Sequence, residues 1–209
     1  MRYLLLSFLL FASCKFDTPQ QTHTARTVDA SKEIENWTCI PGKQVGLVMK
    51  DFSEADIIRI YGRENVGRDT IGLGEGITTI ATTIFPKTEK EIFVSWNPKE
   101  PFQKISEILV EKKNAPWTTS QGIGIGTTLK QLKEINGRDF RFAGFEWDYS
   151  GFTKNWEGGN IPDNVAVFLE PSNPEAVYPD LLGDELFSSN HPKALAAGLK
   201  VRAMIFYFE

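Results

Sequence analysis

The chain has 209 residues, of which 41% are hydrophobic, 12% aromatic and 24% charged, proportions of an ordinary globular protein. This composition excludes a disordered chain and a protein with several membrane spans. The net charge of −4 argues against a nucleic-acid-binding domain, which would carry a basic surface. Two cysteines are too few for a disulfide-dense scaffold, and two histidines leave little for imidazole-based metal or acid–base chemistry.

Residues 1–13 are predicted to be a secretory signal peptide. Arg2 precedes an apolar run, residues 3–12, which is too short to span a bilayer as a helix. The run ends in the sequence FASC, which resembles the lipobox of bacterial lipoproteins, with Phe11 where the common form has leucine. The resemblance implies cleavage before Cys14 and acylation of this residue. The alternatives are an ordinary signal peptide with an incidental cysteine, and a buried N-terminal strand.

Residues 14–36 are polar, show no apolar period and are predicted to form a disordered tether. The lipoprotein pattern implies several acyl chains, and two or more give stable membrane anchoring. Lys15 stands where enteric inner-membrane lipoproteins carry a retention aspartate. We therefore expect a lipid-anchored protein of the bacterial cell envelope, with the outer membrane favoured.

Cys39 has no disulfide partner if Cys14 is acylated. It lies in a short apolar stretch, where a lone cysteine is most often a small buried hydrophobic residue. A catalytic nucleophile would need a nearby base. A disulfide between the two cysteines is the alternative if the lipidation prediction is wrong.

The rest of the chain is predicted to form two tandem units, residues 37–112 and residues 113–209, the second with a C-terminal extension. The segment Ser53–Glu64 recurs as Thr128–Asp139, and the offset is the same at every position of the segment. Both copies open with a hydroxyl residue followed three positions later by an acidic or amide side chain, which is the capping-box arrangement. Both then place apolar residues on one helical face and end in glycine. Each copy therefore predicts a short helix.

Antiparallel strands are predicted after each helix, because the segments are rich in β-branched and aromatic residues and are separated by turn residues. After the first helix these segments are 77–85, 91–96 and 105–110; after the second they are 140–149, 152–156 and 164–169. A short helix over 192–197 and a strand over 199–208 close the chain. In this last strand the period of two places Lys200 and Arg202 on one face, and Val201, Ala203 and Ile205 on the other.

A capped short helix, a glycine–basic–acidic turn and an aromatic antiparallel meander resemble the small outer-membrane lipoprotein of the β-barrel assembly machinery. Two tandem copies at this spacing resemble the β-lactamase inhibitor protein. The segment Gly122–Tyr149 also resembles a group of uncharacterised Bacteroidetes and spirochaete lipoproteins. These resemblances imply an α+β fold in which two helix-plus-meander units share one sheet, with both helices on one face. The chain departs from the inhibitor in lacking two disulfide-forming cysteines per unit, and its C-terminal extension matches neither unit.

Motifs for catalysis are scarce. The glycine-rich segment Gly122–Gly126 lacks the lysine of a P-loop and the spacing of a dinucleotide fingerprint, so we expect a tight entry into the second helix. Glu146 and Asp148 alternate on a predicted strand, and paired carboxylates can hydrolyse glycosidic bonds, but solvated strand residues explain the pair more simply. We expect no enzyme activity, no cofactor and no metal site, with a carbohydrate-active hydrolase as the least favoured alternative.

Aromatic residues are concentrated in the second unit, at Phe140, Phe142, Phe145, Trp147, Tyr149, Phe152 and Trp156. Most are expected in the core. Helices can cover only one face of a wide sheet, however, and large rings on the open face would suit a partner-binding surface. Trp147, Tyr149 and Trp156 are the predicted partner-binding residues. The sequence thus predicts an envelope lipoprotein that binds a protein, as an assembly accessory factor or as a periplasmic enzyme inhibitor.

Overall fold

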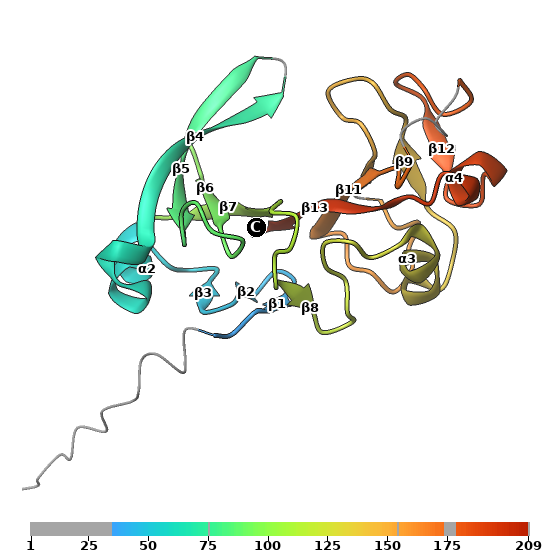
Figure 1. Ribbon diagram of the computed structural model, residues 1–209. Helices are drawn as coiled ribbons and strands as arrows, with labels where there is room; N and C mark the ends of the chain where they lie inside the picture. Colours follow the sequence, from blue (N-terminus) through green and yellow to red (C-terminus); the bar gives the residue numbers. More distant parts are fainter. Residues whose placement is uncertain (1–34, 75, 154, 174–178, 209) are drawn as a thin grey trace, which may run out of the picture.

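The computed structural model describes residues 35–74, 76–153, 155–173 and 179–208 (Figure 1). The fold is α+β and is built around a seven-stranded antiparallel sheet with the strand order β10-β11-β13-β7-β6-β5-β4. The predicted signal peptide, Cys14 and most of the predicted tether lie outside the described residues.

The first half of the chain supplies four strands of this sheet. Helix α2 (Glu54–Tyr61) and the 3₁₀ turn η1 (Arg63–Asn65) precede β4 (Val66–Gly74), β5 (Ile77–Ile84), β6 (Ile92–Trp96) and β7 (Ile105–Val110). Each strand pairs with the one before it. The predictions for β5, β6 and β7 are confirmed. Strand β4 was not predicted, because its three glycines and two charged residues are unfavourable in strands.

The second half supplies the other three strands. Helix α3 (Leu129–Asn136) is followed by β9 (Arg141–Ala143), β10 (Phe152–Thr153), β11 (Val165–Glu170), β12 (Leu186–Ser188), α4 (Pro192–Ala196) and β13 (Lys200–Tyr207). Strands β10, β11 and β13 extend the large sheet through the pairing of β13 with β7. Strands β9 and β12 form a separate two-stranded sheet.

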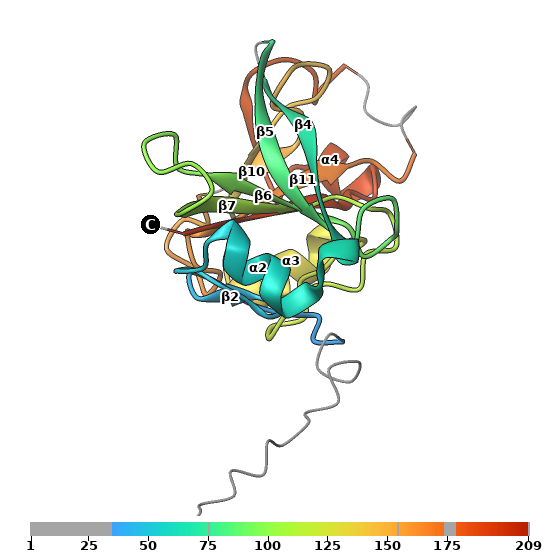
Figure 2. The same ribbon diagram turned by 90° about the vertical axis from the view of Figure 1, so that its left-hand side faces the viewer.

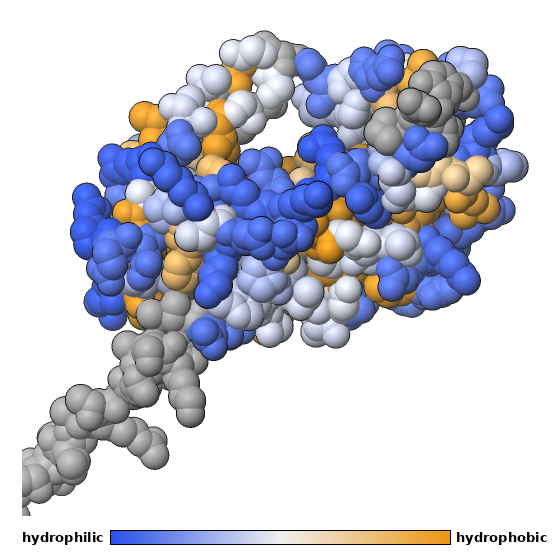
Figure 3. All heavy atoms as spheres, viewed as in Figure 1, coloured by the Kyte–Doolittle hydropathy of each residue, from blue (hydrophilic) through white to orange (hydrophobic). Residues whose placement is uncertain are grey.

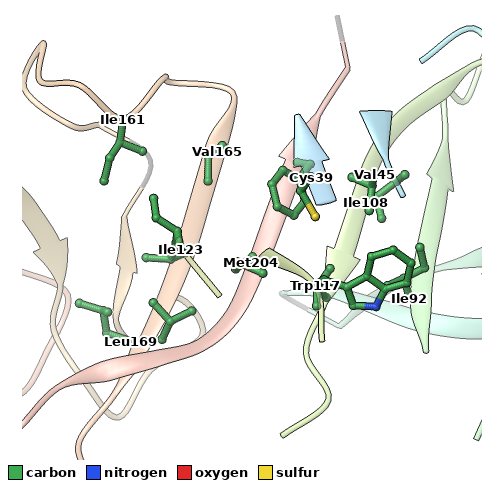
Figure 4. Packing of buried hydrophobic residues seen from close by; sticks show 14 of the residues in the cluster. Cys39, Val45, Ile92, Ile108, Trp117, Ile123, Ile161, Val165, Leu169 and Met204 are labelled. Atoms are coloured by element: carbon green, nitrogen blue, oxygen red, sulfur yellow. The ribbon is translucent and has the colours of Figure 1, made fainter. Parts of the chain in front are cut away.

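A second layer covers one face of the large sheet (Figures 1 and 2). It consists of α2, α3 and a small sheet of β1 (Thr38–Ile40), β2 (Gln44–Val45), β3 (Val48–Met49) and β8 (Thr118–Thr119), in the order β3-β2-β1-β8. Apolar side chains of the two layers pack together, with Cys39 and Val45 close to Ile108 of the large sheet (Figure 4). Burial raises the pKa of the Cys39 thiol to about 12, so this cysteine is the small buried residue that the sequence predicts.

Both predicted helices are confirmed, together with their capping boxes. The Ser53 hydroxyl accepts from the backbone N–H of Asp56, whose carboxylate accepts from the backbone N–H of Ser53. Thr128 and Gln131 make the same pair of contacts at the start of α3. These contacts satisfy backbone N–H groups that a helix start leaves unpaired.

The constant offset between the two halves extends beyond the helices. Strand β4 begins at Val66 and β9 begins at Arg141. The number of residues between these two starts equals the number between Ser53 and Thr128. The same interval separates Phe152 at the start of β10 from Ile77 at the start of β5. The two halves then differ, because β9 leaves the large sheet to pair with β12, and because β12 and α4 lie between β11 and β13.

Two predictions about strand geometry are wrong. The strand predicted over 140–149 ends at Ala143, and Glu146 has a positive φ of 66°, so Glu146 and Asp148 do not alternate on one strand. In β13 an extra residue shifts the register: Phe168 lies opposite Ala203, whereas Leu169 lies opposite Val201. Because of this shift, Val201 faces the core whereas Ala203 and Ile205 face the opposite side of the sheet. The three residues therefore do not share one face, although the period of two predicts that they do.

The hairpin of β4 and β5 forms an arm that projects from the sheet, because only Thr82 to Ile84 of β5 pair with β6 (Figure 2). The base of this arm is fixed to α2. The Arg68 guanidinium donates to both carboxylate oxygens of Glu54, at 2.9 and 2.5 Å, and lowers the pKa of this carboxyl. The Thr82 hydroxyl donates to Glu54 at 2.6 Å and accepts from the Trp96 indole at 2.9 Å.

The capping box of α2 contains an ionisable carboxyl group, that of Asp56, whereas the capping box of α3 contains the neutral amide of Gln131. The stability that the first box provides should therefore depend on pH. The hydrogen bonds from Ser53, assisted by Arg59, lower the pKa of Asp56 from 3.8 to about 2. The stabilisation from the ionised Asp56 is therefore complete above its unfolded pKa and is lost as the pH falls through its folded pKa. We expect Asp56→Asn to lower the free energy of unfolding at about pH 6 more than at about pH 2.5 in urea titrations.

Gln131→Ala is the matched control, because the amide of α3 does not ionise. Its effect on the free energy of unfolding should be similar at both pH values. An Asp56→Asn effect that is equally large at both values would contradict this account.

Candidate functional site

The large sheet has an open face, on the side opposite α2, α3 and the small sheet (Figure 1). A groove of about 340 Å³ lies there. Its lining comes from β7, β10, β11 and β13, from Ile71, Gly72 and Gly74 on the arm, and from Asp148 and Tyr149 in the turn before β10. In Figure 3 the arm of β4 and β5 curves over this side of the molecule, toward the part of the second half that contains β9 and β12 in Figure 1.

A row of aromatic rings runs along one side of the groove. The Trp147 and Tyr149 ring centroids are 5.4 Å apart, those of Tyr149 and Phe152 are 6.3 Å apart, and those of Phe152 and Phe168 are 5.0 Å apart. The Arg202 guanidinium lies 4.7 Å from the Phe168 ring centre and ends the row. These spacings fall within the range of favourable aromatic and cation–π contacts, so the rings hold one another in place.

The turn that carries Trp147 and Tyr149 is held by several hydrogen bonds. The backbone N–H of Trp147 donates to the Ser150 hydroxyl at 3.1 Å, and this hydroxyl donates back to the Trp147 carbonyl at 2.8 Å. The Trp147 indole donates to the Gly144 carbonyl at 3.0 Å. Gly151, with a φ of 73°, lies so close to β11 that a Cβ atom would collide with the Leu169 carbonyl oxygen. Glycine at this position therefore lets the turn pack against the sheet.

Trp147 and Tyr149 are exposed, as the partner-binding prediction requires, with 37% and 38% of their surface accessible. Trp156 is fully buried, so its assignment to the binding surface is wrong. Its indole donates to the Val165 carbonyl at 2.8 Å, and its ring packs edge-on against Phe140. Trp156 lies beyond the end of β10 at Thr153, so the alternation of a strand does not place its side chain on the open face.

Sequence reasoning did not assign Phe152 and Phe168 to this site. Both are half-buried and line the groove. Phe152 was recognised only as a member of the aromatic cluster. The bulge between β11 and β13 had no signal in the sequence.

Charged groups surround the rings. Among the described residues, the charged side chains that line the groove are Glu107, Glu111, Asp148 and the cationic Arg202. Burial and the nearby Glu107 carboxylate raise the pKa of Tyr207 to about 12, so this phenol remains neutral near pH 7. The groove therefore has an acidic and aromatic lining.

Among the residues that the structure describes, no three His, Cys, Asp or Glu side chains are grouped closely enough to hold a metal ion. Nor does any helix in the described ranges have the length and apolar character needed to cross a membrane.

No protein-family model and no curated protein matches the chain. Among solved structures, the chain is similar to the crystal structure of the uncharacterized protein yfeY from Escherichia coli. The two share 15% sequence identity with a TM-score of 0.48, over 79% of this chain and 97% of yfeY.

The two tryptophans should respond differently to truncation. Trp156→Ala should lower the free energy of unfolding by about 3–5 kcal/mol, because it leaves a cavity and an unpaired Val165 carbonyl. Trp147→Ala should cost less, because its side chain is partly in water. Urea titration of both variants tests this assignment, and equal losses would contradict the placement of Trp147 at the surface.

Proposed function

We propose that this protein is an envelope lipoprotein, anchored through Cys14, that binds a protein partner through the open face of its large sheet and performs no catalysis. The observation that carries the proposal is the row of aromatic rings at the groove, in which Tyr149, Phe152 and Phe168 line the groove and the exposed Trp147 contacts Tyr149 at the end of the row. The row lies on the side of the large sheet opposite α2 and α3 (Figure 1).

The chemistry of the row favours binding. Large aromatic side chains dominate the hot spots of protein interfaces, because they bury much apolar area with little loss of side-chain freedom. Tyr149 is already held between the rings of Trp147 and Phe152. Little conformational entropy would therefore be lost when a partner covers it.

The position at which the described part of the chain begins supports a groove that is accessible to a partner. The described part begins at Glu35 and enters the small sheet at β1, on the covered side of the large sheet (Figure 1). A tether of about 20 residues has an r.m.s. reach of about 25 Å if it is flexible. Such a tether would attach the protein from the covered side and leave the open face free for a partner.

We also propose that the two halves are tandem copies of one helix-plus-meander unit, as in the β-lactamase inhibitor protein. The shared capping boxes and the common offset of α3, β9 and β10 support this interpretation. In both halves the strands of the large sheet run in chain order from the edge of the sheet toward its centre.

Site-specific photo-crosslinking in the native envelope tests the binding proposal. A benzoylphenylalanine placed at Tyr149 keeps an aromatic ring in the row and should give a discrete crosslinked protein. The same group at Lys130, an exposed residue of α3 on the covered side, is the control. Absence of a crosslink at Tyr149, or equal crosslinking at both positions, would contradict the proposal.

The isolated partner then allows a measurement of affinity. Tyr149→Ala should weaken binding by at least ~2 kcal/mol, the usual scale of a hot spot, and should lower the free energy of unfolding less than Trp156→Ala does. The identity of the partner also separates two functions, because an assembly factor would capture an envelope component and an inhibitor would lower the activity of a captured enzyme.

A further inference from the structure

The lining of the groove indicates the chemistry of its ligand. We infer that the groove takes an extended peptide segment that carries lysine or arginine side chains between apolar ones. This inference rests on the proposed function and specifies the class of segment that the partner presents.

The groove wall carries carboxylates that attract a cationic ligand. Asp148 and Glu111 are exposed carboxylates on the groove wall, and neither forms an ion pair within the described ranges of the chain. Asp148 immediately precedes the exposed Tyr149 in the turn. A cationic side chain placed against this ring would therefore lie close to a carboxylate.

A cationic side chain of the protein itself already packs on one ring of the row. The Arg202 guanidinium lies over the Phe168 ring and ends the aromatic row. Ring faces attract cations through their quadrupole, and arginine is the most frequent partner. The rings of Trp147 and Tyr149 have the same chemistry at the exposed end of the row.

The site extends beyond the groove itself. A second hollow of about 470 Å³ adjoins the groove and shares Glu111 and Arg202 with it. Its charged lining is mixed, with Lys113, Lys200 and Arg202 beside Glu111 and Glu170, and Lys200 pairs with Glu170 at 3.4 Å. This hollow therefore adds length to the site, whereas the unpaired carboxylates Asp148 and Glu111 provide the preference for cations. Because the two hollows meet at Glu111, the surface accommodates a run of several residues. Apolar and ionic contacts along it favour an extended chain with alternating side chains.

Fluorescence polarisation with the purified full-length protein tests this inference. The probe is a labelled peptide, Gly-Lys-Leu-Lys-Phe-Lys-Leu-Gly, and the comparison is the same peptide with glutamate in place of each lysine. The lysine peptide should bind at least about tenfold more tightly. Its affinity should fall as salt rises from about 50 to about 300 mM, because exposed charges are screened.

Matched variants locate the effect. The double substitution Asp148→Asn with Glu111→Gln should weaken binding of the lysine peptide about fivefold, since two partly exposed ion pairs are lost. Asp163→Asn with Glu100→Gln removes two exposed carboxylates that do not line the groove and should leave the affinity unchanged. Unfolding curves for all variants verify that the fold is intact.

Three results would overturn the inference: equal or tighter binding of the glutamate peptide, equal weakening by the control pair, or displacement of the lysine peptide by a neutral oligosaccharide such as chitohexaose. If the crosslink at Tyr149 still forms in the envelope, the protein-binding proposal stands and only the cationic class of segment is rejected. Loss of that crosslink rejects the proposed function itself.

Discussion

The pairing of β7 with β13 sets the geometry of both faces of the large sheet. It joins strands from the two halves of the chain at the centre of the large sheet. Ile108 lies opposite Phe206 and both face the core, whereas Leu109 lies opposite Ile205 on the open face. One register therefore determines both the packing between the layers and the floor of the groove. A slip by one residue would exchange the two faces of either strand.

The walls of the groove depend on two further features, one from each half. The arm rises from the edge of the sheet because β4 and β5 continue past the pairing with β6, and the contacts of Glu54 with Arg68 and Thr82 hold its base to α2. On the other side, Gly151 lets the turn approach β11, which places Tyr149 beside Phe152. The two walls of the groove are thus held independently, the arm by its contacts with Glu54 and the turn by its close packing against β11.

Local signals predicted the helices and several strands, because their causes lie within a few residues. The capping boxes place a hydroxyl and its partner three positions apart, and the β-branched residues of β5 favour a strand wherever it packs. Interactions between distant segments were not predictable in this way. Strand β4 forms despite its glycines because β5 lies beside it, and Ala203 changes face because of a bulge against β11.

In the candidate site, too, the features with local causes were predictable and those that depend on contacts between distant segments were not. Trp147 and Tyr149 are exposed, as expected, although they lie in the turn between β9 and β10 and not on a strand of the open face. The burial of Trp156 departs from the expectation, because alternation along a strand applies only within the strand, and β10 ends at Thr153. Phe168 and Arg202 join the rings only through the pairing of β11 with β13, a contact between segments far apart in the sequence.

The proposed function requires that a partner cover the open sheet face, with its aromatic row, in the cell envelope. Hydroxyl-radical footprinting of the protein in intact envelopes and after purification measures whether this face is covered. We expect oxidation of Trp147 and Tyr149 to be lower in the envelope than in the purified protein, while the buried Trp156 remains protected in both. Equal oxidation of Trp147 and Tyr149 in the two preparations would contradict the account.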